Sequence, residues 1–211
     1  MTGDDRGSGN CAQAMRSTAL GRDARILRDA LLVAVGTSPG SFIRTIEEVE
    51  RQPFEHWIDE IRSSTWAVAQ RGKEIVGLVA GKLPDSAKDR EDQAFTRYIE
   101  SVWITPELRG KGLGKRLIRF LLEMEYRKNQ QIRQFLLWVL ATNDAAKKMY
   151  EHMGFWATKE SKHLERSDHS TDEVEVKYCL DFDATVHTTD EAGRQQDRRL
   201  YGVTYRVLGE S

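Results

Sequence analysis

A nearly continuous apolar run constrains the fold of this chain more than any other feature. The segment Gln134–Leu140 reads QFLLWVL, with apolar side chains at consecutive rather than alternate positions. A strand of this kind must be covered on both faces, which is typical of a central strand in a sheet that carries helices on each side. We therefore expect a layered α/β fold around this segment.

Helices are predicted from the spacing of apolar residues. The spacing is helical in four segments, approximately residues 22–35, 41–62, 113–127 and 143–153. Ser41 is placed to cap the second segment, and Pro53 begins the later part of it. Gly154 suits the left-handed residue that ends the last helix.

Strands are predicted from β-rich runs bounded by turn residues. These runs are residues 65–70, 74–83, 97–104, 134–140, about 155–159 and 174–182. Residues 71–73 suit a hairpin between the first two runs, and Pro106 ends the third. The order is helices, a β-meander, then strand–helix–strand–helix–strand–strand, which favours a mixed α/β sandwich with helices on both sheet faces.

The 211 residues suggest one domain with appendages. Residues 1–12 are rich in Gly, Asp and Ser and are predicted to be a flexible leader, followed by one domain over residues 13–182. Residues 183–211 form a C-terminal extension that is polar until residues 200–208, where apolar residues alternate. That alternation predicts either an added edge strand or a dimer arm, so we expect a monomer or a homodimer.

Composition excludes several classes of protein. With 32 basic and 33 acidic side chains, the net charge of −1 argues against a surface built to bind nucleic acid. Only Cys11 and Cys179 are present, which excludes a disulfide framework and a Cys-rich zinc site, and the five His show no metal-ligand spacing. No targeting segment is visible, and the apolar runs are far shorter than the roughly 20 residues of a membrane span. We expect a cytoplasmic protein without a membrane or nucleic-acid partner.

The segment 102–115, VWITPELRGKGLGK, predicts a binding site for phosphate or pyrophosphate. A strand ends, and a short loop with alternating glycines leads into a helix. The glycines are Gly110, Gly112 and Gly114, and the basic residues beside them are Arg109, Lys111 and Lys115. Glycines let the backbone approach a ligand closely, and the unpaired N–H groups of a first helical turn bind anionic oxygens.

Other phosphate motifs fit this segment less well. Lys115 is followed by Arg116 rather than by Ser or Thr, so it is not a P-loop. A dinucleotide fingerprint requires its third glycine three residues beyond the second. A helix start with turn glycines, without any ligand, is the structural alternative.

A second segment lies about thirty residues later, from Asn143 to Phe155. Taken alone, Asn143 is a helix N-cap, and the apolar residues at 146, 149, 150 and 153 are the buried stripe of a helix.

Together, the two segments resemble the GNAT superfamily of acyl-CoA-dependent N-acetyltransferases. Residues 109–114, RGKGLG, resemble its Arg/Gln-x-x-Gly-x-Gly/Ala signature, and Asn143, Ala146, Tyr150-Glu151 and Gly154-Phe155 resemble its second helix and the strand beyond. The resemblance covers about residues 20–182. It implies a GNAT-like α/β fold, with a mixed, mostly antiparallel central sheet of six to seven strands and helices on both faces.

The resemblance also implies roles for individual residues, with acetyl-CoA as co-substrate and no metal. Backbone groups of Val102, Trp103 and Ile104 would pair with the pantetheine arm of CoA. The CoA pyrophosphate would be held by the backbone N–H groups of seven consecutive residues, which are Arg109, Gly110, Lys111, Gly112, Leu113, Gly114 and Lys115. Asn143 would contact the CoA arm, and the Tyr150 hydroxyl would face the CoA sulfur.

The chemistry of acetyl transfer needs a base and an acid. An amine must lose a proton before it attacks a thioester, and Glu100, on the strand that would border the acetyl group, is the candidate base; a paired or solvent-facing carboxylate is the alternative. With a reference pKa of about 10 against about 8.5 for a thiol, Tyr150 is protonated at neutral pH and can donate to the leaving thiolate. A backbone N–H near Trp103 or Ile104 would polarise the carbonyl oxygen.

The sequence therefore predicts an enzyme that moves an acetyl group from acetyl-CoA to a primary amine by direct attack in a ternary complex. A small-molecule acceptor is favoured, entering between residues 36–40, the strand of Glu100 and residues 161–173. A protein lysine or N-terminal amine is the alternative acceptor. A non-catalytic acyl-CoA sensor and a nucleotide-binding protein are the rival classes.

Overall fold

The protein is described by a computed structural model, which covers residues 6–164, 173–182, 195 and 201–210, with side chains from residue 19 onward. Its strands form a seven-stranded sheet in the order β5-β6-β4-β3-β2-β1-β7. They are β1 (Thr65–Arg71), β2 (Glu74–Lys82), β3 (Thr96–Ile104), β4 (Gln134–Leu140), β5 (Trp156–Leu164), β6 (Glu173–Asp181) and β7 (Val203–Val207). Among the strand pairs of the described residues, only β3–β4 is parallel. The predicted mixed, mostly antiparallel sheet is therefore confirmed.

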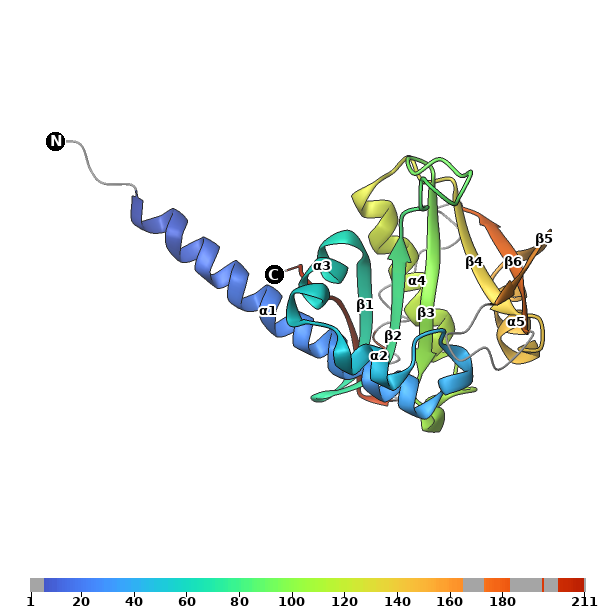
Figure 1. Ribbon diagram of the computed structural model, residues 1–211, viewed down its shortest axis with the longest axis horizontal. Helices are drawn as coiled ribbons and strands as arrows, with labels where there is room; N and C mark the ends of the chain where they lie inside the picture. The colour runs from blue at the N-terminus through green and yellow to red at the C-terminus, as the bar shows by residue number, and fades with distance from the viewer. Residues whose placement is uncertain (1–5, 165–172, 183–194, 196–200, 211) are drawn as a thin grey trace.

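Helices cover both faces of the sheet, as Figure 1 shows. They are α1 (Arg6–Thr37), α2 (Ile46–Arg51), α3 (Phe54–Ser63), α4 (Leu113–Lys128) and α5 (Asp144–Glu151), with short 3-10 turns at η1 (Pro39–Ser41) and η2 (Pro106–Leu108). Helices α4 and α5 pack on one face, where Phe135 and Leu137 of β4 are buried. Leu136 is buried on the other face, beside Tyr98 and Cys179. Strand β4 therefore buries residues on both of its faces, although Trp138 and Leu140 stay partly exposed.

Helix α1 is longer than the predicted segment 22–35. It begins at Arg6, so residues 6–12, which we expected to be a flexible leader, form its first turns, and these extend away from the sheet (Figure 1). Before Leu20 the sequence has no continuous stripe of large apolar residues at helical spacing. The spacing of apolar residues therefore did not predict a helix there. Further along, Leu27 and Leu31 face α3 and the sheet, and both are fully buried.

The second predicted helical region divides into α2 and α3. Ser41 does not cap it; the cap is Thr45, whose hydroxyl accepts from the Glu48 N–H at 3.2 Å while the Glu48 carboxylate accepts from the Thr45 N–H at 2.8 Å. This reciprocal capping box satisfies two otherwise unpaired donors, which a lone serine four residues earlier cannot do. As predicted, Pro53 precedes α3, which buries Trp57 on the face toward α1.

The C-terminal strand β7 pairs antiparallel with β1 at the edge of its own sheet. Asp23 of α1 anchors this strand, because its carboxylate accepts from the Arg206 guanidinium at 2.9 Å and from the Gly209 N–H at 2.8 Å. The residue is only 1% exposed. The extension therefore completes the fold of the chain that carries it.

Replacing Asp23 by alanine is expected to lower the free energy of unfolding by about 1–3 kcal/mol, because the Gly209 N–H and part of the Arg206 guanidinium lose a charged partner. Asp29→Ala is the matched control on the same helix, since the Asp29 side chain is 71% exposed. Urea unfolding followed by circular dichroism measures both. Equal small changes in the two variants would show that Asp23 does not hold β7.

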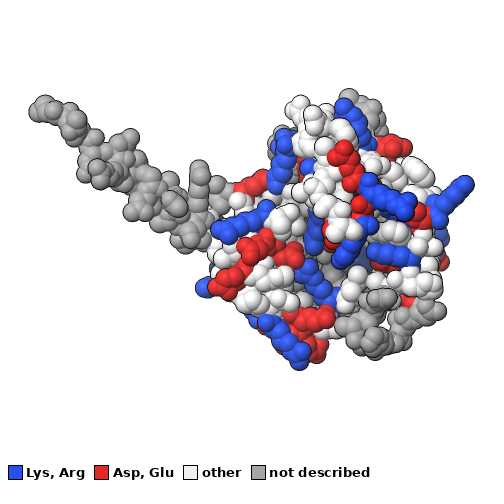
Figure 2. Space-filling model, turned by 45° about the horizontal axis from the view of Figure 1, so that its top comes forward, with Lys and Arg blue, Asp and Glu red and all other residues white. Residues whose placement is uncertain are grey.

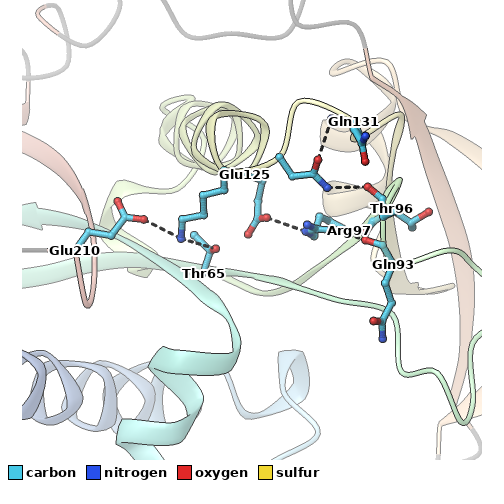
Figure 3. Close-up of polar contacts among 10 residues, drawn as sticks. Thr65, Gln93, Thr96, Arg97, Glu125, Gln131 and Glu210 are labelled. Carbon is cyan, nitrogen blue, oxygen red and sulfur yellow. Dashed lines mark hydrogen bonds and ion pairs between the residues drawn. The ribbon is translucent and has the colours of Figure 1, made fainter.

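A polar cluster joins β3 to the end of α4 away from the glycine loop (Figure 3). The Arg97 Nε atom donates to the Glu125 carboxylate at 2.9 Å, and the two side chains are 11% and 4% exposed. Arg97 also donates to the carbonyl oxygens of Gln93 and Thr96, at 2.6 and 2.7 Å. The Glu125 carboxylate packs so closely on Gly81 that a Cβ there would lie 2.6 Å from Oε1. This pair is a buried structural element of the fold.

Acidic and basic side chains are interspersed over the face of the molecule that Figure 2 presents. This mixture agrees with the net charge of −1. Within the described residues, none of the helices combines the length and the apolar composition that crossing a membrane requires.

Candidate active site

Strands β3 and β4 separate partway along their length. Their parallel pairing covers only residues 96–98 and 134–136, and in Figure 1 the strands β4, β6 and β5 lean away from the rest of the sheet. On its other edge β3 stays paired with β2, but Ser101 and Val102 together stand opposite Val79. Ser101 has a left-handed backbone, with φ of 54°. Such a bulge bends a strand, and it marks the point at which β3 leaves β4.

A cavity of about 570 Å³ lies at this opening. It brings together nearly all of the residues that the sequence predicted for the site. Those that line it are Glu100, Val102, Trp103, Ile104, Arg109, Gly110, Gly112, Leu113, Gly114, Lys115, Asn143 and Tyr150. Lys111 does not line it, and its ammonium group donates to the Glu107 carbonyl oxygen at 2.9 Å. Its backbone N–H lies within the same loop.

The glycine loop presents backbone donors at one end of the cavity. Gly110 and Gly112 have φ values of 73° and 82°, a left-handed conformation that favours glycine. Gly114 packs against α5, where an added Cβ would lie 3.2 Å from the Met149 sulfur. Helix α4 begins at Leu113, so the N–H groups of its first turn lack intrahelical acceptors. This arrangement suits a polyanionic group.

Arg109 holds this loop in place. Its Nε atom donates to the Ile104 carbonyl oxygen at 3.0 Å, and its Nη2 atom donates to the Ser38 hydroxyl. Ser38 is buried between α1 and η1. The guanidinium therefore joins the glycine loop to the end of β3 and to the segment after α1, a role that sequence spacing did not reveal.

Tyr150 lines the cavity from α5. The helix begins at the N-cap Asn143, whose side-chain oxygen accepts from the Ala146 N–H at 3.1 Å. The Tyr150 ring packs near Phe155 and Tyr178, with centroids 5.7 and 6.4 Å away, and burial raises the pKa of its hydroxyl above the ordinary value near 10. Among the described residues, none forms a hydrogen bond with that hydroxyl, and the residue lines the cavity.

Glu100 lines the cavity from β3, and half of its side chain is exposed. The Lys82 ammonium lies 3.2 Å from the Glu100 carboxylate and 3.8 Å from that of Glu60. Burial opposes ionisation of Glu60, but the positive charges of Arg44 and Lys82 hold its pKa below the usual range. Glu100 is thus both a carboxylate in the cavity and one end of an ion-pair network that reaches α3.

The sequence matches a known family over the part of the chain that builds this cavity. The family model for the acetyltransferase (GNAT) family matches residues 36–155, which are more than half of the chain and include β3, the glycine loop and α5. The chain belongs to the GNAT acetyltransferase family.

Relatives and solved structures agree with this assignment. The mycothiol acetyltransferase of Thermobispora bispora is 29% identical over 143 residues, which are 67% of this chain and 45% of that protein. That of Acidothermus cellulolyticus is 27% identical over 145 residues, or 64% of this chain and 42% of that protein. The chain thus spans less than half the length of the curated relatives that it matches.

Two solved structures share the fold. The ribosomal-protein-alanine N-acetyltransferase of Brucella melitensis has a TM-score of 0.58 at 17% identity, over 77% of this chain and 96% of that one. The acetyltransferase yncA of Salmonella typhimurium, solved with its cofactor acetyl-CoA, has a TM-score of 0.58 at 17% identity, over 82% and 94%. At this identity both show the GNAT fold alone.

The structure adds residues to the GNAT cavity that sequence reasoning did not assign to it. Ser41, Trp138 and Glu175 line it together with the predicted set. No periodic signal singles out Glu175, because its position depends on its pairing with Leu140 in the folded sheet. Of the loops expected around the acceptor, residues 165–172 lie outside the described residues.

Cys179 stands apart from this site. It is buried and does not line the cavity, and burial raises the pKa of its thiol to about 11. A protonated thiol outside the cavity does not suit a covalent acetyl carrier. Within the described parts of the chain, no group of three His, Cys, Asp or Glu side chains is placed to hold a metal ion.

Proposed function

We propose that this protein is an N-acetyltransferase that moves an acetyl group from acetyl-CoA to a primary amine by direct attack in a ternary complex. One observation carries the proposal: a single cavity holds the glycine loop at one end and, farther along, a carboxylate and a protonated phenol. The acetyltransferase domain comprises residues 13–182, and residues 183–211 are a C-terminal extension.

The residues present suit CoA. The first turn of α4 and the loop from Arg109 to Lys115 offer backbone N–H groups and a lysine to the pyrophosphate. Beyond residue 98, the β3 edge that faces β4 has no strand partner among the described residues. Backbone groups of Val102, Trp103 and Ile104 on that strand bind the pantetheine arm, and Asn143 contacts it from the start of α5. The acetyl-CoA in the yncA structure supports the same co-substrate here.

Glu100 acts as the general base of the reaction and Tyr150 as its general acid. The acceptor enters as an ammonium ion and gives one proton to Glu100, directly or through water, and from there to solvent. The neutral nitrogen bonds to the thioester carbonyl carbon while the carbonyl oxygen is held by a backbone N–H near Trp103 or Ile104. As the carbon–sulfur bond breaks, Tyr150 donates its proton to sulfur and recovers one from the nitrogen. The products are an amide, free CoA and one released proton.

The acceptor is a small molecule in this proposal. The cavity of about 570 Å³, which CoA and the acceptor would share, has the size of sites that bind small ligands. The relatives named mycothiol acetyltransferase also support an acceptor of low molecular weight. A lysine or an N-terminal amine of a protein is the second candidate.

A thiol-release assay tests the function. The full chain is mixed with acetyl-CoA and a panel of small amines, lysine peptides and peptides with free N-termini, and free CoA is measured. Release with a small amine supports the proposal, whereas release only with peptides favours the second candidate. If calorimetry shows that CoA binds but no amine causes release of free CoA, the protein would be a non-catalytic acyl-CoA sensor. A larger thermal shift with ATP or NAD than with CoA would instead indicate a nucleotide-binding protein.

Replacing Glu100 by glutamine is expected to lower kcat by about 10- to 100-fold, because the amine loses its proton acceptor. The pH profile of the rate should also change, because the variant no longer has a proton acceptor at this position. Lys82→Met is the matched control, since it breaks the same ion pair and keeps the carboxylate. Equal losses in both variants would mean that Glu100 acts only through the ion pair.

A further inference from the structure

Two carboxylates and an indole line the cavity in addition to the residues proposed to contact CoA. Glu100 comes from β3, Trp138 from β4 and Glu175 from β6. In the sheet, β4 lies between β3 and β6. Strand alternation puts the three side chains on the same sheet face as the cluster of Tyr98, Leu136 and Cys179. Directly opposite Trp138 on β6 is Lys177, whose ammonium lies 5.5 Å from the ring centroid, and the two carboxylates lie farther out on either side.

Glu175 is the more deeply placed of the two carboxylates. The residue is 9% exposed, and its Oε2 atom is buried without a hydrogen bond from any described residue. The Lys162 ammonium on β5 lies 3.3 Å from that oxygen, as an ion pair. A buried carboxylate of this kind requires a cation beside it.

The ammonium group of Lys162 already lies beside Glu175 and Trp138. The Lys162 nitrogen lies 4.3 Å from the centroid of the Trp138 ring as well as beside Glu175, so a primary ammonium contacts an aromatic face and a carboxylate together. Its side chain is 47% exposed. Because this lysine side chain reaches solvent, its ammonium can leave when another cation takes its place beside Glu175. Lys82 pairs with Glu100 in the same way.

We propose that the acceptor carries a second cationic nitrogen, as a diamine or polyamine does, and that Glu175 and Trp138 bind it in place of the Lys162 ammonium. The reacting nitrogen lies at Glu100, so this inference rests on the proposed function. Because β4 separates them, the strands of the two carboxylates are roughly 10 Å apart or more. One ammonium group cannot serve both, whereas the two ends of an extended diamine can.

Matched amines and matched variants test this inference. The full chain is assayed with acetyl-CoA and cadaverine, spermidine or pentylamine, the last lacking the second nitrogen. We expect kcat/KM to be about 10- to 100-fold higher for cadaverine than for pentylamine, in line with one charge-assisted contact. Glu175→Gln should abolish this preference by lowering kcat/KM for cadaverine toward the value for pentylamine, and Lys162→Gln should raise the affinity for cadaverine. Asp181→Asn, at the exposed end of the same strand, should change neither.

Several outcomes would overturn the inference. It is wrong if pentylamine and cadaverine are equally good substrates, or if Glu175→Gln slows both amines alike. Loss of cadaverine affinity in Lys162→Gln would mean that this lysine, rather than the carboxylate, contacts the acceptor. Calorimetry with cadaverine in the presence of CoA separates the two proposals: Glu175-dependent binding without acetylation of any amine would support the cation site and contradict the enzyme.

Discussion

Tyr150→Phe is expected to lower kcat by about 10²- to 10⁴-fold, the effect of losing a positioned proton donor. The substitution removes only the hydroxyl, so the ring keeps its buried place beside Phe155 and Tyr178. The dissociation constant for CoA should therefore change little. Steady-state release of free CoA gives kcat, and calorimetry gives the dissociation constant.

The role of Tyr150 as proton donor also predicts how the wild-type rate depends on pH. Burial raises the pKa of Tyr150, which favours the protonated form, so the donor is retained until pH passes the folded-state value. The rate should not fall through loss of this donor below about pH 10. Tyr178→Phe is the control, because that hydroxyl donates to the Glu151 carboxylate at 3.0 Å and does not line the cavity. Wild-type turnover in Tyr150→Phe would remove the acid role.

Arg97→Ala is expected to lower the free energy of unfolding by about 3–5 kcal/mol, because it leaves the Glu125 carboxylate buried without its counterion. The pair lies between β3 and α4, and the Glu125 side chain is 4% exposed (Figure 3). Arg97 also binds the carbonyl oxygens of Gln93 and Thr96. Urea unfolding of the purified variant measures the loss.

Two further variants separate the buried pair from a general effect of removing an arginine. Arg62→Ala breaks an exposed pair with Asp59, whose side chains are 65% and 74% exposed, and should cost no more than about 1 kcal/mol. The double variant Arg97→Met with Glu125→Leu should recover much of the stability, since no charge then remains buried. An Arg97→Ala variant as stable as Arg62→Ala would contradict the prediction.

Much of the fold could be predicted because its signals are local. The apolar run 134–140 is strand β4 with the same ends, and the helix predicted from Leu113 is α4. Predictions were poorer where burial is not periodic. The first turns of α1 bear no apolar stripe, and β5 runs to Leu164, past its predicted end, with most of its residues exposed. Such segments are shaped by backbone hydrogen bonds, which leave no hydrophobic pattern.

The sequence by itself determined the glycine loop, the N-cap at Asn143 and the place of Tyr150, because each depends on neighbours within a few residues. Only the tertiary structure decided that Arg109 bonds to Ser38, that Glu100 pairs with Lys82, and that Glu175 faces the same cavity. These partners lie far apart in the chain. They meet because β3 and β4 diverge after three paired residues and β6 pairs beside β4, and strand register is set by packing across the whole sheet rather than by local sequence.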